Sequence, residues 1–233
     1  MAGIRGLLGS LLMLVLLPLL IGATDPACQV QVARQAYGVE IVTEGQEWNE
    51  VSLGTVLDAL SRLPSDVVSQ LDGPLDGPLY ILCNTSARSL SGTRVYPNGA
   101  NFFSTNDGRS EIVLYPNQGT LTVLHELGHA YQLRLVPAGR YALAFQDPEV
   151  RDFMRATGWT LLSSDAEVAA ALDQTEISFA YDGPQVWQSL SNPDPLEDYA
   201  NSFALFFYDP ERLGELSPGR YEWMLAHIGV GGG

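Results

Sequence analysis

The chain has 233 residues, of which 46% are hydrophobic and 17% are charged, so it is too apolar to belong to the disordered proteins. Its formal net charge of -15 would repel the phosphate backbone of nucleic acids and anionic membrane surfaces. These values argue against a nucleic-acid partner and predict one packed, acidic domain that is soluble in an extracellular medium.

The N-terminal segment has the pattern of an export signal. Arg5 supplies one positive charge, an apolar stretch follows over residues 7–21, and small residues come after it. The stretch contains Pro18 and is shorter than the roughly 20 apolar residues of a membrane-spanning helix. We therefore expect residues 1–23 to be a signal peptide. Residues 24–233 would form a single secreted domain, extracellular or in the periplasm or cell envelope, without stable membrane association.

Cys28 and Cys83 are the two cysteines of the chain. Because export passes a chain through compartments where thiols oxidise, we expect one disulfide between them. Two unpaired buried thiols are the alternative. A cysteine metal site is not expected, since the sequence has no Cys-x-x-Cys spacing.

In the first half, the residue pattern predicts one helix packed on a small sheet. Apolar residues recur at helical spacing over residues 48–63, and Pro64 ends the pattern. Residues 79–83 and 111–115 are short apolar runs bounded by turn residues, which predicts two strands. Phe102 and Phe103 lie between turn signals and form a candidate intervening strand.

After Thr120, helical spacing dominates the chain. The predicted helices cover residues 121–135, 148–157, 165–172 and 195–207, with a short one near residues 221–227. A sheet region followed by a helical region is typical of the α+β class. We therefore expect an α+β fold with a small N-terminal mixed sheet and helix, and then a mainly helical half.

The motif His-Glu-x-x-His occurs at His125, Glu126 and His129. Residues four apart lie on one helical face, so both imidazoles can bind one zinc ion. Glu126 can then reach a metal-bound water molecule and act as general base. An ordinary helix that carries these residues by chance is the alternative. Against it, the chain has only 3 histidines, and the flanks of the motif are uncharged and apolar.

A zinc site of this kind needs a third protein ligand. A metzincin would carry glycine and histidine where this chain has Gln132 and Leu135, so that subclass is excluded. Glu197, in the first turn of the helix that begins near Pro195, is the best carboxylate candidate. On spacing alone, an acid that stabilises the N-terminus of a helix is an equal alternative.

Further motifs accompany the His-Glu-x-x-His sequence: Pro-x-Glu-Asp-Tyr-Ala at residues 195–200, Asp-Pro-Glu-Arg-Leu at 209–213, Leu-Ser-Pro at 216–218, and Tyr221. Together they resemble the lethal-factor-like zinc peptidases of the gluzincin group. The resemblance covers roughly residues 51–228, most strongly at the C-terminal end. It implies a zincin-like fold, zinc-dependent peptidase activity, and Glu197 as the third zinc ligand.

Two positions depart from the pattern of that family. Asn201 stands where the family carries a second acid, although its carboxamide can still accept a hydrogen bond. Leu190 stands where the family carries a tyrosine that stabilises the oxyanion. Tyr181 can take that role if the connecting loop is longer, or it is simply a loop tyrosine. His227 is another candidate donor or a rival ligand, unless it only stabilises a helix end.

The sequence therefore predicts a secreted zinc endopeptidase that holds one Zn2+ and cleaves protein or peptide substrates. An extended substrate is expected to pair with the strand at residues 111–115. The alternative is a catalytically inactive zinc- or peptide-binding protein derived from such an enzyme, which Leu190 and Asn201 suggest. A third interpretation, a structural cell-envelope protein, predicts no metal.

Overall fold

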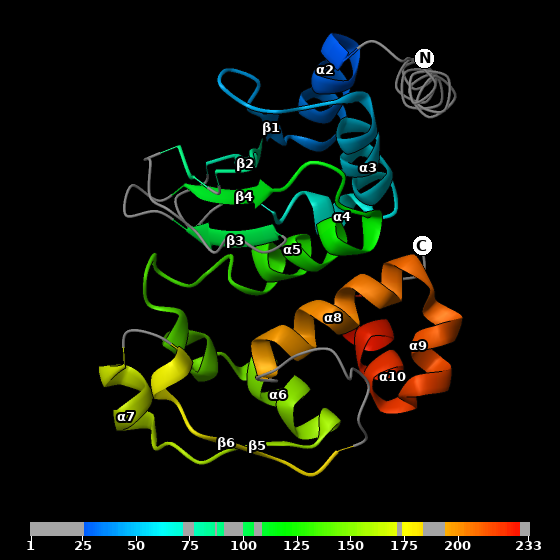
Figure 1. Ribbon diagram of the computed structural model, residues 1–233. Coiled ribbons are helices and arrows are strands. Elements are labelled where there is room, and N and C mark those ends of the chain that lie inside the picture. Colours follow the sequence, from blue (N-terminus) through cyan, green and yellow to red (C-terminus); the bar gives the residue numbers. More distant parts are fainter. Residues whose placement is uncertain are drawn as a thin grey trace, which may run out of the picture.

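The fold was obtained as a computed structural model. The structure describes residues 26–71, 77–86, 88–90, 100–104, 109–171, 174–183 and 194–228. The predicted signal peptide and Leu190 lie outside these residues. Within them, no helix combines the length and the apolar character that crossing a membrane requires. The fold is α+β, as predicted, with a small sheet in the first half and mostly helices in the second (Figure 1).

The sheet contains four strands in the order β1-β2-β4-β3. β1 (Glu40–Ile41), β2 (Leu79–Cys83) and β4 (Ser110–Leu114) run parallel, whereas β3 (Ala100–Ser104) pairs antiparallel with β4. β2 and β4 are buried along most of their length, which explains their nearly continuous apolar sequences. The residue pattern predicted all of these strands except the short β1.

The position of β4 corrects one prediction. β4 lies inside the sheet and pairs with β2 on one side and β3 on the other. Neither edge is left for a substrate, so the prediction that a peptide pairs with residues 111–115 is wrong. β3 holds the outer position instead, and among the described residues no strand pairs with its second edge. Sequence periodicity marks a strand but carries no information on strand order.

Three helices accompany the sheet: α2 (Pro26–Tyr37), α3 (Glu50–Ser61) and α4 (Ser65–Val68). α3 is the predicted helix, and it begins at Asn49, whose side-chain oxygen accepts the backbone N–H of Ser52 at 2.8 Å. α2 was not predicted. It carries Cys28, and both this thiol and that of Cys83 are free, so the predicted disulfide is wrong. Burial raises the pKa of the Cys83 thiol to about 11.

The second half contains the predicted helices with small shifts of their ends. They are α5 (Thr120–Gln132), α6 (Pro148–Thr157), α7 (Asp165–Ala170), α8 (Pro195–Tyr208) and α10 (Pro218–His227), joined by α9 (Pro210–Leu216) and the 3-10 helices η1 (Tyr141–Gln146) and η2 (Gln174–Glu176). The residue pattern missed β5 (Trp159–Leu161) and β6 (Phe179–Tyr181). These two strands pair antiparallel as a hairpin whose long connection contains α7 and η2. Tyr181 therefore lies in a strand and not in a loop.

The core has two apolar clusters that meet near α5 and α8. The larger one joins the sheet, α2, α3, α5 and α8, and the smaller one lies around η1, α6 and β5. Phe102 of β3 packs against both. α5 lies between the sheet and α8 (Figure 1), so the His-Glu-x-x-His helix is enclosed by packed elements on two sides.

Candidate metal site

The three predicted ligands come from α5 and α8 and meet between these helices. Nε2 of His125 lies 3.3 Å from Oε2 of Glu197, and Nε2 of His129 lies 3.4 Å from Oε1 of Glu197. The two Nε2 atoms are 3.1 Å apart. Ligand atoms of all three residues lie within 4.8 Å of one another, so the group could hold a metal ion.

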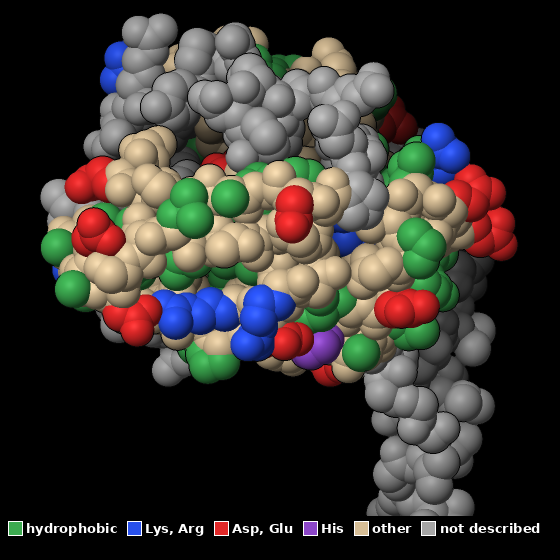
Figure 2. Space-filling view, turned by 90° about the horizontal axis from the view of Figure 1, so that it is seen from below, with side chains coloured by type: hydrophobic (Ala, Val, Ile, Leu, Met, Phe, Trp, Pro, Cys, Tyr) green, Lys and Arg blue, Asp and Glu red, His purple; other side chains and the backbone are tan. Residues whose placement is uncertain are grey.

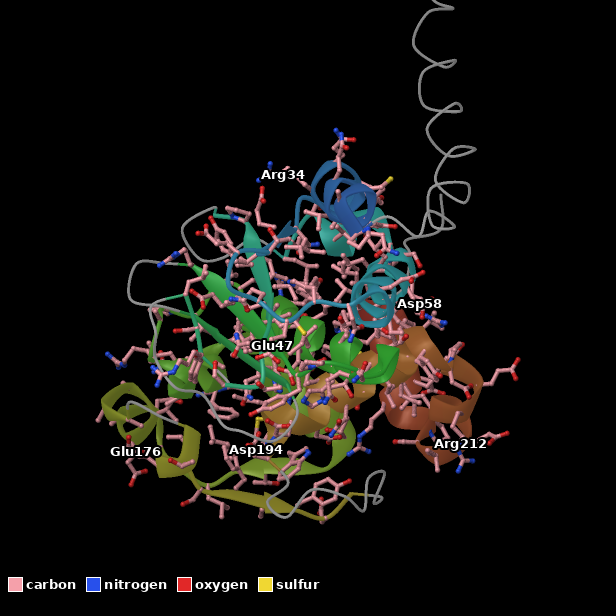
Figure 3. The ribbon with its side chains drawn as sticks, turned by 45° about the horizontal axis from the view of Figure 1, so that its top comes forward. Arg34, Glu47, Asp58, Glu176, Asp194 and Arg212 are labelled. Atoms are coloured by element: carbon pink, nitrogen blue, oxygen red, sulfur yellow. The ribbon has the colours of Figure 1, made fainter. Side chains whose placement is uncertain are left out.

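The first turn of α8 is ordered by residues that fit a helix start. Oδ1 of Asp194 accepts the backbone N–H groups of Leu196 at 2.8 Å and of Glu197 at 3.0 Å. Pro195 follows at the start of the helix, a position that proline favours because its ring restricts the backbone angle to helical values. Figure 3 labels Asp194, the residue that directly precedes α8. Because Asp194 accepts the backbone N–H of Glu197 itself, it fixes the position of the Glu197 backbone. The sequence did not lead us to this residue, although an aspartate before proline is a common signal for the start of a helix.

Asn201 orients the first histidine. Its carboxamide oxygen lies 2.9 Å from Nδ1 of His125, which donates the hydrogen bond. With Nδ1 bonded to Asn201, Nε2 is the ring nitrogen that faces Glu197 and His129 and that is left to bind a metal. Asn201 is one helical turn after Glu197, so α8 supplies both a candidate ligand and the group that orients another.

The charges of the group are mutually dependent. Burial alone raises the pKa of Glu197, but hydrogen bonds and attraction from His125 and His129 outweigh it, so the pKa lies below its usual range. Burial alone lowers the pKa of His129, and the hydrogen bond and charge of Glu197 reverse that shift. Positive charge thus stabilises the buried carboxylate in this position, and a bound cation supplies the same compensation.

Glu126 lies beside this group without belonging to it. Its side chain is buried, and burial raises the pKa of its carboxyl group above the usual range, while the two histidines oppose the shift. Its carboxylate also accepts a hydrogen bond from the backbone N–H of Phe102 in the outer strand β3. A buried carboxyl with a raised pKa next to a metal group has the properties of a general base.

Tyr181 and His227 make other contacts. The hydroxyl oxygen of Tyr181 accepts a hydrogen bond of 2.9 Å from Nη2 of Arg220. The ring of His227 stacks on Trp223 at 4.1 Å between centroids, and its Nδ1 donates to the Trp223 carbonyl oxygen at 2.9 Å. Among the described residues, His227 does not join the group that could hold a metal. The underside of the molecule shows acidic side chains, arginines and a histidine close together (Figure 2).

Neither a protein-family model nor a curated protein matches this chain. The resemblance to the lethal-factor-like peptidases therefore rests on the sequence motifs alone. What the geometry adds is independent of that resemblance, because the two histidines and the remote glutamate meet in space through the packing of α5 on α8.

Proposed function

We propose that the protein is a zinc metallopeptidase in which His125, His129 and Glu197 hold one Zn2+. The spacing of the two histidine nitrogens and the Glu197 carboxylate carries the proposal. In a tetrahedral site with bonds of about 2.0–2.1 Å, neighbouring ligand atoms are roughly 3.3–3.4 Å apart. The two Nε2 atoms are 3.1 Å apart, and they lie 3.3 and 3.4 Å from different oxygens of the Glu197 carboxylate, which is close to this value. Two imidazoles and one carboxylate are also a ligand set of catalytic zinc, which keeps one position open.

Zinc bound in this site would supply a Lewis acid that polarises a carbonyl and lowers the pKa of water. The protein supplies the proton transfer. Glu126 follows His125 on α5, and its raised pKa suits a group that takes a proton from the attacking water and delivers it to the leaving amine. Asn201 holds His125 in the tautomer that a metal ligand needs.

The substrate proposed is an extended protein or peptide that pairs with β3. β3 is the outer strand of the sheet, and its Phe102 N–H reaches the Glu126 carboxylate, so this strand passes directly beside the proposed base. Backbone pairing along such an edge would place a scissile carbonyl in a defined register whatever its side chains. The acidic charge and the N-terminal pattern support a secreted enzyme without a nucleic-acid partner.

Substitution of the proposed base tests the enzyme directly. Glu126→Gln should keep stoichiometric zinc while hydrolysis of a peptide library falls by about 10²–10⁴-fold, the usual contribution of acid–base catalysis. Metal analysis and a library digest read by mass spectrometry measure the two quantities. Glu222→Gln, an exposed change on α10, is the matched control. Undiminished hydrolysis by the Glu126 variant would refute the assigned base.

A zinc- or peptide-binding protein without catalysis is the second candidate. Two observations favour it: Asn201 is a weaker partner for His125 than a carboxylate, and the hydroxyl of Tyr181 is held by Arg220. Wild-type protein that carries one zinc per chain but cleaves no member of the library would establish this candidate and exclude the peptidase. Wild-type protein that binds no zinc would exclude both the peptidase and a zinc-binding protein.

A further inference from the structure

Asp198, the residue after Glu197, is held in a buried ion pair. Arg220 of α10 donates from Nε to Oδ1 of Asp198 at 2.9 Å and from Nη2 to Oδ2 at 2.6 Å. Nε1 of Trp159 in β5 donates to the same Oδ2 at 2.7 Å. Arg220 is only 2% exposed and Asp198 only 8%. A two-pronged contact of this kind fixes the direction of both side chains.

The guanidinium of Arg220 also binds the β5–β6 hairpin. Its Nη1 donates to Oγ of Ser217 at 3.0 Å, and its Nη2 donates to the hydroxyl of Tyr181 at 2.9 Å. Tyr181 is the cross-strand partner of Trp159, and the two rings lie 4.5 Å apart between centroids. One buried arginine therefore joins α10, the hairpin and the first turn of α8.

The end of the hairpin leaves little room for movement. A Cβ atom on Gly183 would come within 2.2 Å of the Thr157 carbonyl oxygen and 2.9 Å of the Tyr181 hydroxyl. Such distances are too short for any side chain, so only glycine fits this position. The hydroxyl of Tyr181 is thus enclosed by the backbone on one side and bonded to Arg220 on another.

We propose that Arg220 is a positioning residue of the metal site that acts through Asp198, an inference that rests on the proposed function. Successive helical residues point about 100° apart, so a fixed Asp198 sets the rotation of α8 and hence the direction of Glu197. A rotation of about 10° moves an atom roughly 5.5 Å from the helix axis by about 1 Å. That displacement is about half of a zinc–oxygen bond length of roughly 2.0–2.2 Å, enough to weaken metal binding.

A purely structural ion pair makes a different prediction. Removing one partner of a buried pair leaves an uncompensated charge, and this destabilises the fold wherever the pair lies. The metal-free protein would then lose stability, but the affinity of the folded state for zinc would not change. A positioning role instead predicts that loss of the ion pair lowers the affinity of the folded protein for zinc.

Two variants of the ion pair separate these roles. Arg220→Lys keeps the charge but loses the two-pronged contact, and Asp198→Asn combined with Arg220→Met removes both charges and keeps an acceptor for Trp159. Val32→Ala in α2, which packs on α3 and β1, is the control for lost stability. Zinc affinity is measured by competition with a chromophoric chelator, and stability by urea unfolding of metal-free protein.

We expect the zinc dissociation constant to rise by about tenfold or more in both Arg220 variants, the usual effect of losing a group that orients a ligand. The control should change it by less than about twofold at a comparable loss of stability. Wild-type zinc affinity in the Lys variant, or in the double variant, would overturn the inference. Wild-type protein that binds no zinc would instead overturn the proposed function, and this inference with it. The Lys variant retains the buried charge, so it decides the question if the double variant does not fold.

Discussion

The hydrogen bond from His125 to Asn201 connects α5 with α8 at the candidate metal site. A neutral carboxamide accepts the Nδ1 proton, whereas a carboxylate in the same place would increase the electron density on Nε2 more strongly. In the proposed zinc site, Asn201 would keep the orientation of the ring but would make His125 a weaker ligand than a carboxylate partner would. Substitutions of Asn201 should therefore be able to raise zinc affinity as well as lower it.

Asn201→Asp is expected to strengthen zinc binding, and Asn201→Ala to weaken it by about 10–100-fold because the ring of His125 loses its acceptor. Competition with a chelator measures both constants. Asn49→Asp, at the start of α3, is a matched change of the same chemistry at a helix cap. Equal zinc affinity in the Asp and Ala variants would show that Asn201 does not act through His125.

The variant Tyr181→Phe tests whether the hydroxyl of Tyr181 donates a hydrogen bond to the oxyanion. The oxygen of Tyr181 accepts a hydrogen bond from Arg220, so a role at the oxyanion would have to come from the hydroxyl proton. If that proton stabilises the oxyanion, Tyr181→Phe should lower kcat by about 10²–10³-fold with zinc affinity preserved. If the hydroxyl only satisfies Arg220, stability falls by about 1 kcal/mol and kcat stays the same. Steady-state kinetics with urea unfolding separate the two results.

Some of these residues could be predicted from the sequence and others could not, for a physical reason. His125 and His129 share a helical face, which spacing alone establishes. Glu197 required the added resemblance, since an acid in a first turn is common. Arg220 was missed because its partners, Asp198 and Tyr181, lie 22 and 39 residues away, and no local pattern marks a contact of that range.

At the scale of elements, the site depends on how closely α5 approaches α8. Gly128 lies between the two histidines of the motif, on the side that faces α8. A Cβ atom there would come 3.1 Å from Cα of Ala200 and 3.2 Å from the side chain of Phe203. These contacts are tighter than normal packing, so glycine sets the distance between the helices. The same distance brings Glu197 to the histidines.

Substitution of Gly128 should therefore separate the helices. Gly128→Ala gains helix propensity of up to about 1 kcal/mol but crowds α8, so its net effect on unfolding is small. Gly128→Val has no such compensation and should cost about 1–3 kcal/mol, the range for overpacked cores. Both should weaken zinc binding. Gly54→Ala in α3, where a Cβ meets nothing within 4 Å, is the control for propensity. Chemical unfolding and chelator competition provide the measurements, and unaltered zinc affinity in the Val variant would contradict the role of Gly128.

Helices were easier to predict than sheet structure. α6 and α8 each begin with proline after an aspartate that caps the helix, and these signals are local. β5 and β6 have three residues each, too few for an alternating pattern to be recognised. The strand order that places β3 outside β4 depends on pairing between distant segments.

At the scale of the whole molecule, the candidate metal group lies between parts of the chain that belong to different apolar clusters. α5 and most of α8 belong to the larger apolar cluster, while Leu196, next to the candidate ligand Glu197, belongs to the smaller one. An ion bound by His125, His129 and Glu197 would therefore link the two clusters as well as the two helices. Its binding energy would add to the stability of the complete fold, because an unfolded chain does not preserve the site.

Metal removal should consequently lower the unfolding temperature. At a free zinc concentration of about 100 times the dissociation constant, binding stabilises the folded state by about 2.7 kcal/mol. For a domain of this size, each kcal/mol shifts Tm by about 2–4 °C, so chelation should lower Tm by about 5–11 °C. Scanning calorimetry with zinc, with a chelator, and after zinc is restored measures the shift and its reversal. Glu197→Gln should abolish most of the zinc-dependent part, whereas Glu211→Gln, an exposed change on α9, should keep it. A Tm that does not respond to zinc in the wild-type protein would show that these three residues hold no metal.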